Sequence, residues 1–239
     1  MNTIKIEKKH SRLVAHRGLS GIERENTNSA FVAAGNRSYY GIETDIHRTS
    51  DGKFIVCHDQ TLERVAGENL NVETVSLSVS QNVVLFDKDG TKGRLDLIPS
   101  TLQNYISICK KYEKHCVLEL KNRFTDEEIQ AIIDIIKEFD YLENVTFISF
   151  AYENLPKIRA VLPDQSVQFL FGEATEEIIE NLIRDRIDVD IRASMLTREL
   201  VERFHEAGLV VNCWTVDDKQ RAEELVEMGV DFITTNILE

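Results

Sequence analysis

The sequence lacks the features of a secreted, disulfide-bonded or membrane-spanning protein. Its four cysteines, Cys57, Cys109, Cys116 and Cys213, form no CxxC pair, and three of them lie in apolar runs. Buried free thiols are therefore expected, as in a reducing compartment. No apolar run approaches the ~20 residues that span a bilayer, and the polar, basic residues 1–11 contain no secretory apolar core. We expect a cytoplasmic protein.

Positive charge is also scarce. The 239 residues include 28 Lys and Arg against 41 Asp and Glu, which gives a net charge of −13. A chain this acidic does not suit nucleic acid or an anionic membrane surface as a partner. An anionic small-molecule substrate would need a local cluster of cations or a bound metal ion to offset the negative field.

The sequence does contain a regular alternation of strand-like and helix-like segments. With 42% hydrophobic and 29% charged residues, the chain can form one large α/β domain or two small ones. Eight strands are expected, at residues 12–15, 41–48, 116–121, 145–150, 166–171, 187–191, 209–216 and 232–235. Helical patterns follow the first seven, at residues 27–36, 101–111, 126–139, 153–161, 175–184, 198–207 and 218–228. This alternation predicts an α/β fold of the (β/α)8 TIM-barrel type, in one domain over residues 1–239, with no full helix after the last strand.

One segment departs from the alternation. Asp51-Gly52 indicates a turn after the second strand, and residues 54–57 are typical of a short returning strand. Residues 60–98 then hold three glycines, short Val-rich runs and no helical period. We predict that 60–98 is an irregular insertion on the top face of the barrel.

Three carboxylates are expected to meet inside such a barrel. Side chains alternate along a strand, so Glu43 and Asp45 point the same way, ~7 Å apart. Glu119 and Lys121 point inward from a neighbouring strand by the same parity. Two anions on one face repel unless a cation lies between them, and oxygen ligands suit a hard ion, Ca²⁺ or Mg²⁺. Simple ion pairs, Glu43 with Arg17 and Glu119 with Lys121, are the alternative.

Two histidines each end an apolar run beside a charged residue: His16 precedes Arg17, and His58 precedes Asp59. A lone histidine is more often structural, but a pair that flanks the carboxylate strand favours proton transfer. Imidazole titrates near neutrality and can take a proton from a nucleophile or give one to a leaving group. Arg17 can clasp two phosphate oxygens, and Lys121 adds a point charge. These residue types predict hydrolysis or transfer at a phosphate ester.

An ordered set of short motifs runs through nearly the whole chain. They are His16-Arg17-Gly18, Glu25-Asn26-Thr27, Gly41 to Asp45, Thr49 to Gly52, His58-Asp59, Glu119-Leu120-Lys121, Val211 to Val216 and Phe232 to Thr235. Together they resemble the signature of the glycerophosphodiester phosphodiesterases. The resemblance implies a metal-dependent hydrolase that converts a glycerophosphodiester to sn-glycerol 3-phosphate and an alcohol. It also implies that the two histidines are the acid and base, in an order left open.

Five further positions complete or modify the expected site. The resemblance implies that Asn26 binds substrate, by orienting the phosphate or a catalytic group. Trp214 is expected to face inward, where it either walls the glycerol pocket or packs in the core, and Phe150 is a similar candidate. The family commonly has proline where this chain has Arg24. It often has aspartate where this chain has Asn236, a loss of one carboxylate for which we expect a structural effect.

Three alternatives stay open at this point. A lyase or isomerase would hold Mg²⁺ against an enolate, but it needs one base and leaves the histidine pair unexplained. A non-catalytic phosphate-binding barrel predicts loss of a histidine or a metal carboxylate, and none is lost. A lysophospholipase-D-type phosphodiesterase would want an exposed apolar lip, and residues 60–98 offer only short pieces such as Val83 to Phe86. The expected partner is a small-molecule glycerophosphodiester, and no particular oligomeric state is predicted.

Overall fold

A closed barrel of eight parallel strands forms the centre of the protein, in a computed structural model that describes residues 2–239. The barrel strands are β1 (Arg12–Ala15), β2 (Gly41–Arg48), β4 (His115–Leu120), β5 (Val145–Ser149), β6 (Val167–Phe171), β7 (Asp188–Arg192), β8 (Val211–Trp214) and β9 (Phe232–Thr235). Strand β1 pairs with β9 on one side and with β2 on the other, and these pairings close the ring. The predicted (β/α)8 barrel is confirmed.

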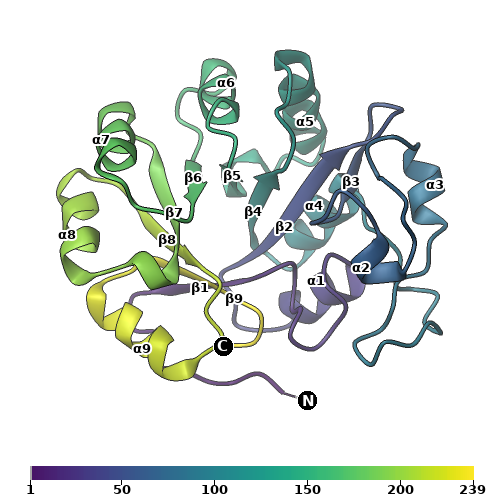
Figure 1. Cartoon of the computed structure of the whole chain (residues 1–239), viewed down its shortest axis with the longest axis horizontal. Helices are drawn as coiled ribbons and strands as arrows, with labels where there is room; N and C mark the ends of the chain where they lie inside the picture. Colours follow the sequence, from purple (N-terminus) through teal and green to yellow (C-terminus); the bar gives the residue numbers. More distant parts are fainter. Residues whose placement is uncertain (1) are drawn as a thin grey trace.

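Seven helices connect successive barrel strands and lie outside them (Figure 1). They are α1 (Asn28–Gly35), α4 (Leu102–Lys111), α5 (Asp126–Glu138), α6 (Asn154–Val161), α7 (Glu176–Asp185), α8 (Arg198–Glu206) and α9 (Lys219–Met228). Two single-turn 3-10 helices, η1 (Leu142–Asn144) and η2 (Ala193–Met195), precede β5 and follow β7. All seven predicted connecting helices are present.

N-cap residues mark where most of these helices begin. Six of the seven start after a residue whose side chain accepts a hydrogen bond from the first turn: Thr27, Thr101, Thr125, Thr175, Thr197 and Asp218. Such N-caps satisfy backbone N–H groups that have no partner inside the helix. At α5 the cap is reciprocal, because the Glu128 side chain also accepts from the Thr125 N–H.

The insertion is more regular than its sequence predicts. Strand β3 (Phe54–Val56) returns antiparallel to β2, as expected. Residues 60–98 were expected to hold no helix, but α2 (Glu63–Ala66) and α3 (Leu77–Gln81) lie within them, so that prediction is wrong. The physical reason is length: four or five residues make little more than one turn, too short for a 3.6-residue period to show.

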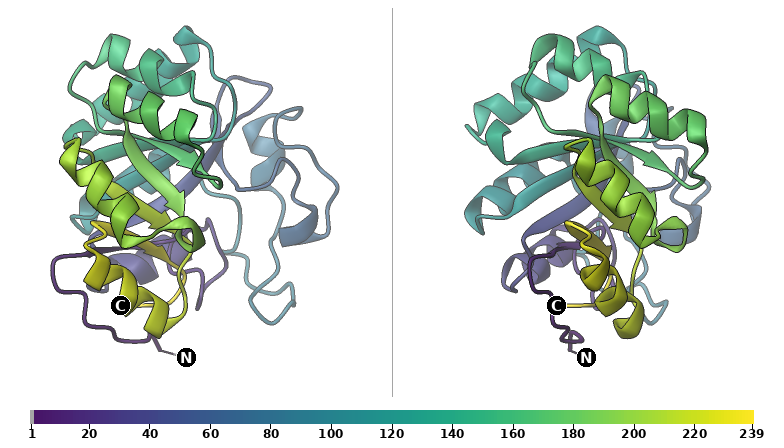
Figure 2. Two further views of the ribbon diagram at one scale, coloured as in Figure 1. Left: turned by 60° about the vertical axis from the view of Figure 1, so that its left-hand side comes forward. Right: turned by 90° about the vertical axis from the view of Figure 1, so that its left-hand side faces the viewer.

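The insertion contacts the loop that follows β1. The Arg24 guanidinium donates to the Phe86 carbonyl and, over 2.7 Å, to the Asp87 carbonyl. The Lys88 ammonium donates to the Ser20 carbonyl at 2.6 Å. Because this loop leaves the carboxyl end of β1, these contacts put the insertion at that end of the barrel, beside the helical ring (Figure 2).

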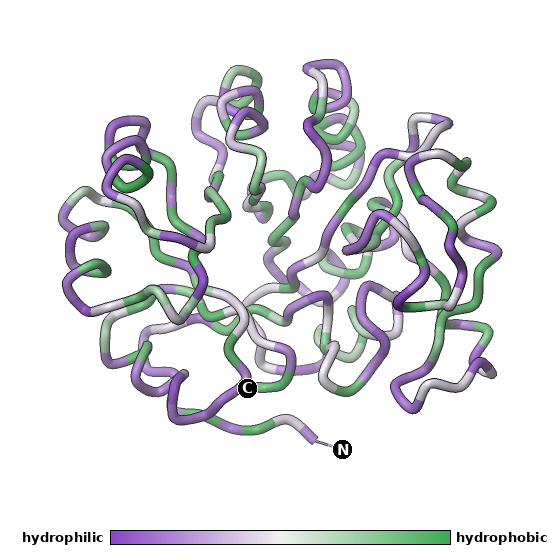
Figure 3. Tube along the Cα trace, viewed as in Figure 1, coloured by the Kyte–Doolittle hydropathy of each residue, from purple (hydrophilic) through white to green (hydrophobic). Residues whose placement is uncertain are grey.

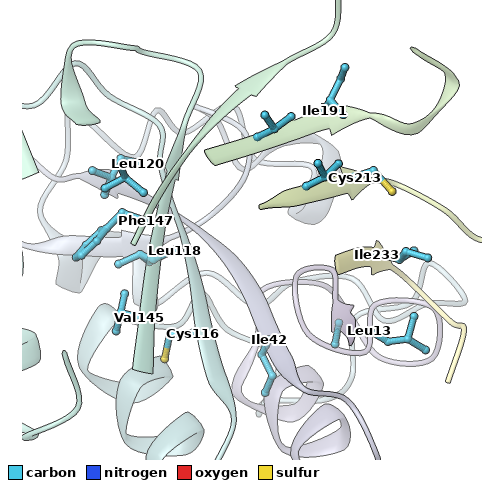
Figure 4. Packing of buried hydrophobic residues seen from close by; sticks show 14 of the residues in the cluster. Leu13, Ile42, Cys116, Leu118, Leu120, Val145, Phe147, Ile191, Cys213 and Ile233 are labelled. Carbon is cyan, nitrogen blue, oxygen red and sulfur yellow. The ribbon is translucent and has the colours of Figure 1, made fainter. Parts of the chain in front are cut away.

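The main hydrophobic core lies between the strands and the helices. Figure 4 displays its outward-facing strand residues, among them Leu13, Ile42 and Leu118. All four cysteines are buried free thiols, as predicted. Apolar and polar residues alternate along the helices, so each helix has an apolar side toward the strands and a polar side away from them (Figure 3). Inside the barrel the apolar cluster is smaller, centred on Val14, Val117, Ile148 and Leu170, so the interior has space for polar groups.

The first and last residues of the described chain pair with each other beyond the end of β9. A parallel bridge joins Ile4 to Leu238, and the Ile4 N–H donates to the Ile237 carbonyl at 3.1 Å. Within residues 2–239, no helix follows β9, which agrees with the expectation. None of the helices in this described range has both the length and the hydrophobicity of a membrane span.

Candidate active site

The loop after β1 turns sharply to present two groups to the barrel mouth. The His16 N–H donates to the Thr235 carbonyl at 2.8 Å, which extends the pairing of β1 with β9. Arg17 then adopts a left-handed φ of 54°, and its N–H donates to the Glu43 carboxylate at 2.8 Å. Gly18 follows with φ 77°, and a Cβ there would lie 2.7 Å from Ala30 of α1. Only glycine fits this approach, so the turn that aims His16 and Arg17 depends on it.

His16 is oriented by the residue that follows β9. The Asn236 side-chain nitrogen donates to the Asp217 carboxylate at 2.6 Å, so the Asn236 oxygen is the free acceptor. That oxygen receives the Ser20 hydroxyl at 2.6 Å and lies 2.8 Å from His16 Nδ1. His16 Nδ1 must therefore carry the proton, which leaves Nε2 unprotonated in the neutral ring. Burial and, in the same direction, the nearby Arg17 lower the pKa of His16.

His58 is oriented differently, by a charged partner. The Cys57 N–H donates to the Asp45 carbonyl at 3.1 Å and brings His58 beside β2. His58 Nδ1 lies 2.6 Å from the Asp59 carboxylate, which can only accept when ionised. Burial lowers the pKa of His58, and Asp45 and Asp59 oppose that shift. The partner of His58 is thus a carboxylate, whereas the partner of His16 is a neutral amide. A carboxylate stabilises the imidazolium form more strongly than an amide does.

One arginine of the insertion joins the loop after β1 to the segment after β3 that carries His58. Arg64, on α2, donates to both Glu25 oxygens at 2.8 Å and to Asp59 at 2.6 Å. Glu25 also accepts from the Arg17 guanidinium at 2.8 Å. A continuous chain of charged hydrogen bonds therefore runs from His58 through Asp59, Arg64 and Glu25 to Arg17. Sequence reasoning missed Arg64, because only the fold brings α2 next to the loop after β1.

The three predicted metal carboxylates converge. One oxygen each from Glu43, Asp45 and Glu119 lies within 4.8 Å of the others, and all three residues are buried. Asp45 Oδ1 is buried with no hydrogen-bond partner. Burial and the neighbouring Asp45 raise the pKa of Glu43 well above its usual range, and burial with Asp45 raises that of Glu119 to about 8. Carboxylates in such a setting need an added cation to stay ionised together.

The charges around this centre do not balance. Five carboxylates face three cations: Glu25, Glu43, Asp45, Asp59 and Glu119 against Arg17, Arg64 and Lys121. The carboxylates exceed the cations by two even without Asp190, which also lines the adjoining cavity, so a bound cation would reduce the repulsion. An all-oxygen ligand set of this size suits Ca²⁺ or Mg²⁺. The residues present therefore fit the predicted metal.

The simple ion-pair alternative describes only part of the centre. Lys121 does pair with Glu119 at 2.8 Å, and it lies 3.5 Å from Asp45. Glu43, by contrast, accepts from the Arg17 backbone and makes no pair with its guanidinium, which lies 2.8 Å from Glu25 and 3.6 Å from Asp45. Arg17 Nε is buried without a hydrogen-bond partner, so the guanidinium retains capacity for an anion.

A cavity of about 170 Å³ opens beside these groups. His16, His58, Arg17, Glu43 and Glu119 line one part of it. The remaining wall is mostly apolar and comes from Ile148, Phe150, Leu170, Asp190, Trp214, Thr215 and Thr234. The rings of Phe150 and Trp214 meet edge to face, with centroids 5.6 Å apart. Trp214 faces inward and both aromatic residues line the cavity, but their contact with substrate stays a prediction.

Asn26 lies in the site but is already engaged. It is 4% exposed; its nitrogen donates to Asp45 at 2.8 Å, and its oxygen accepts from the Thr44 hydroxyl at 2.8 Å. These contacts orient Asp45; the expected role of Asn26 in orienting the phosphate or a catalytic group stays a prediction. Direct contact between Asn26 and substrate stays a prediction.

The cavity is also lined by Asp190 on β7, which sequence reasoning missed. The alternation of inward and outward side chains along a barrel strand could have placed it inside.

The fold and site together define a barrel enzyme built for phosphate-ester chemistry. The family model for the glycerophosphoryl diester phosphodiesterase family matches residues 16–239, and the chain belongs to that family. A glycerophosphodiester phosphodiesterase of Caldanaerobacter subterraneus is 28% identical over 227 residues, which cover 94% of this chain and 93% of that protein. The structural match is equally complete.

Two solved structures illustrate that match. A phosphodiesterase from Oleispira antarctica, in complex with the product sn-glycerol-3-phosphate, is 25% identical with a TM-score of 0.86, over 94% of this chain and 92% of that one. A glycerophosphodiester phosphodiesterase from Parabacteroides distasonis is also 25% identical, with a TM-score of 0.79 over 96% and 94%. The expected family and enzyme class are confirmed.

Proposed function

We propose that this protein hydrolyses glycerophosphodiesters to sn-glycerol 3-phosphate and an alcohol, with a divalent metal ion as cofactor. The observation that carries the proposal is the convergence of His16, His58, Arg17, Glu43 and Glu119 on one small cavity. Asp45 and Lys121 adjoin these groups, because Asp45 completes the carboxylate cluster and Lys121 pairs with Glu119. The product complex of the Oleispira antarctica relative supports the choice of substrate class. The buried free thiols are compatible with a cytoplasmic location.

Glu43, Asp45 and Glu119 would hold the metal ion. When bound, a divalent ion supplies Lewis-acid polarisation of a phosphoryl oxygen. Arg17 and Lys121 neutralise the remaining phosphate charge, since a guanidinium can bind two oxygens and an ammonium acts as a point charge. Asn26 holds Asp45 in place through its hydrogen bond at 2.8 Å. The anionic phosphodiester is thus attracted to a chain whose net charge is −13.

The two histidines divide proton transfer according to their partners. His16 donates Nδ1–H to the neutral Asn236, so Nε2 has a lone pair and takes the proton from the attacking oxygen. His58 donates Nδ1–H to the Asp59 carboxylate, which favours a proton on Nε2. As the phosphorus–oxygen bond to the head group breaks, His58 gives that proton to the leaving alcohol. Water is the net nucleophile, and the products are a phosphomonoester and an alcohol.

A metal-restoration assay on a substrate panel tests the proposal. Purified protein is stripped with EDTA and assayed on glycerophosphocholine and glycerophosphoethanolamine, with Ca²⁺, Mg²⁺ or Mn²⁺ restored separately. We expect glycerol 3-phosphate from both substrates and loss of activity without metal. Full activity after EDTA would refute the metal role. Release of choline from lysophosphatidylcholine, with no action on either deacylated diester, would indicate the lysophospholipase-D-type alternative.

A further inference from the structure

The barrel interior contains a carboxylate that the mechanism above does not use. Asp190 lies on β7, is 1% exposed and lines the same cavity as the catalytic groups. Its Oδ1 is buried with no hydrogen-bond partner. Its backbone carbonyl accepts from the Trp214 indole at 3.3 Å, so the Asp190 main chain supports one cavity wall while the side chain keeps an unpaired oxygen.

The polar side chains around Asp190 are paired with one another instead. Asn212, its register partner on β8, donates to Gln168 at 3.1 Å and accepts from the Thr234 hydroxyl at 3.3 Å. None of the salt bridges within residues 2–239 includes Asp190. The charged neighbour that acts on its pKa is Glu119, which has the same sign and raises it. A buried oxygen without a partner is costly. Since neither packing nor an ion pair explains this carboxyl group, the cavity is where its partner belongs.

The strand order places Asp190 opposite the phosphate end of the site. Around the ring, β7 is separated from β2 by three strands in either direction. Glu43 and Asp45 come from β2, and Arg17 follows the adjacent β1. A diester anchored there by its phosphate therefore extends across the cavity toward β7. At about 170 Å³ the cavity is smaller than the ~300–1,000 Å³ typical of sites for drug-sized ligands. A cavity of this size suits a three-carbon polyol.

We propose that Asp190 binds the free terminal hydroxyl of the substrate's glycerol moiety and so selects deacylated glycerophosphodiesters against acylated ones. The hydroxyl supplies the missing hydrogen-bond partner of Oδ1, while Leu170 and Trp214 contact the carbon chain. Acylation removes the hydroxyl's hydrogen, so an acylated substrate cannot donate to Oδ1. A site built to hydrogen-bond a hydroxyl discriminates strongly against a substrate that lacks it. This inference rests on the proposed function.

The test compares three choline esters by one readout, release of free choline. They are glycerophosphocholine, the analogue whose terminal hydroxyl is replaced by hydrogen, and lysophosphatidylcholine. For the wild type we expect kcat/KM on glycerophosphocholine to exceed that on the deoxy analogue by about 5- to 150-fold, the equivalent of about 1–3 kcal/mol for one unpaired buried group. In Asp190→Ala the two values should lie within about threefold, because the glycerol substrate alone loses its partner.

Two further variants keep the comparison decisive. Asp190→Leu has a similar shape without polar atoms, so it reports on the hydrogen bond if the alanine variant does not fold. Asp188→Asn is the matched control: Asp188 is on the same strand, accepts from the Val210 N–H at 2.9 Å and does not line the cavity. It should keep the wild-type ratio.

The outcomes separate this inference from the proposed function. Equal wild-type rates on glycerophosphocholine and its deoxy analogue, or an unchanged ratio in Asp190→Leu, would overturn the role of Asp190 while leaving the diesterase activity established. A wild type that releases no choline from any of the three esters, with metal restored, would instead overturn the proposed function and this inference with it.

Discussion

Replacing Asp59 with asparagine isolates the electrostatic difference between the two histidines. Asp59 lies 2.6 Å from His58 Nδ1 and is also held by Arg64 at 2.6 Å. In Asp59→Asn the side-chain oxygen can still accept from Nδ1, so the orientation of His58 is kept, while the negative charge and the acceptor for Arg64 are lost. The variant therefore gives His58 the same kind of neutral partner that Asn236 gives His16.

The size of the effect follows from the contact. A hydrogen bond to a charged group contributes ~1.5–3 kcal/mol, but the His58 side chain is 34% exposed, so water screens part of it. We take ~1–1.5 kcal/mol as the stabilisation of the imidazolium that is lost with the carboxylate. Loss of the carboxylate destabilises the imidazolium, so the pKa of His58 falls.

The sign of the change in the pH profile follows from the acid role. A general acid must be protonated, so the rate declines as pH rises through its pKa. We expect the alkaline limb of the kcat profile on glycerophosphocholine to move to lower pH in Asp59→Asn, with the acidic limb in place. The control is Asp89→Asn, which removes an exposed charge from the insertion and should move neither limb.

Two results would contradict this reasoning. If the acidic limb moves down and the alkaline limb stays, His58 is the base and the two roles are reversed. If neither limb moves, the Asp59 carboxylate does not control proton transfer at His58.

Three other predictions test separate parts of the structure. His16→Ala and His58→Ala should each lower turnover of glycerophosphocholine ~10²–10⁴-fold, but a nitrophenyl phosphodiester, whose leaving group needs no proton, should restore only His58→Ala; equal losses on both substrates would defeat the division of roles. Glu43→Gln should abolish divalent-metal binding measured by calorimetry together with most activity, whereas full activity in EDTA would show that the enzyme works without metal. Thr125→Ala should cost ~1 kcal/mol through loss of the α5 cap and lower Tm by ~2–4 °C with kcat unchanged; an unaltered Tm would mean that the cap contributes no stability.

The barrel was predictable because its strands and helices each leave a local trace. Most barrel strands contain a short apolar run, and the cap residues mark six helix starts. The alternation of side chains along β2 and β4 placed the metal carboxylates on one face. The two helices of the insertion left no such trace, because each is about one turn long.

The contacts that differentiate the histidines could not be predicted in this way. His16 and Asn236 are 220 residues apart, and only closure of the ring by β1 and β9 makes them neighbours. For Asn236 the sequence indicated a lost carboxylate with a structural effect. In the structure its oxygen instead determines which His16 nitrogen carries the proton.

The lost carboxylate therefore has a chemical consequence. An aspartate in the place of Asn236 would favour imidazolium at His16, as Asp59 does at His58, and the two rings would compete for the role of acid. Burial lowers the pKa of both rings and each hydrogen-bond partner raises it, but only at His58 is that partner a negative charge. Pairs of titratable groups in unlike environments take unlike roles. The neutral partner at position 236 is thus what supports His16 as the base.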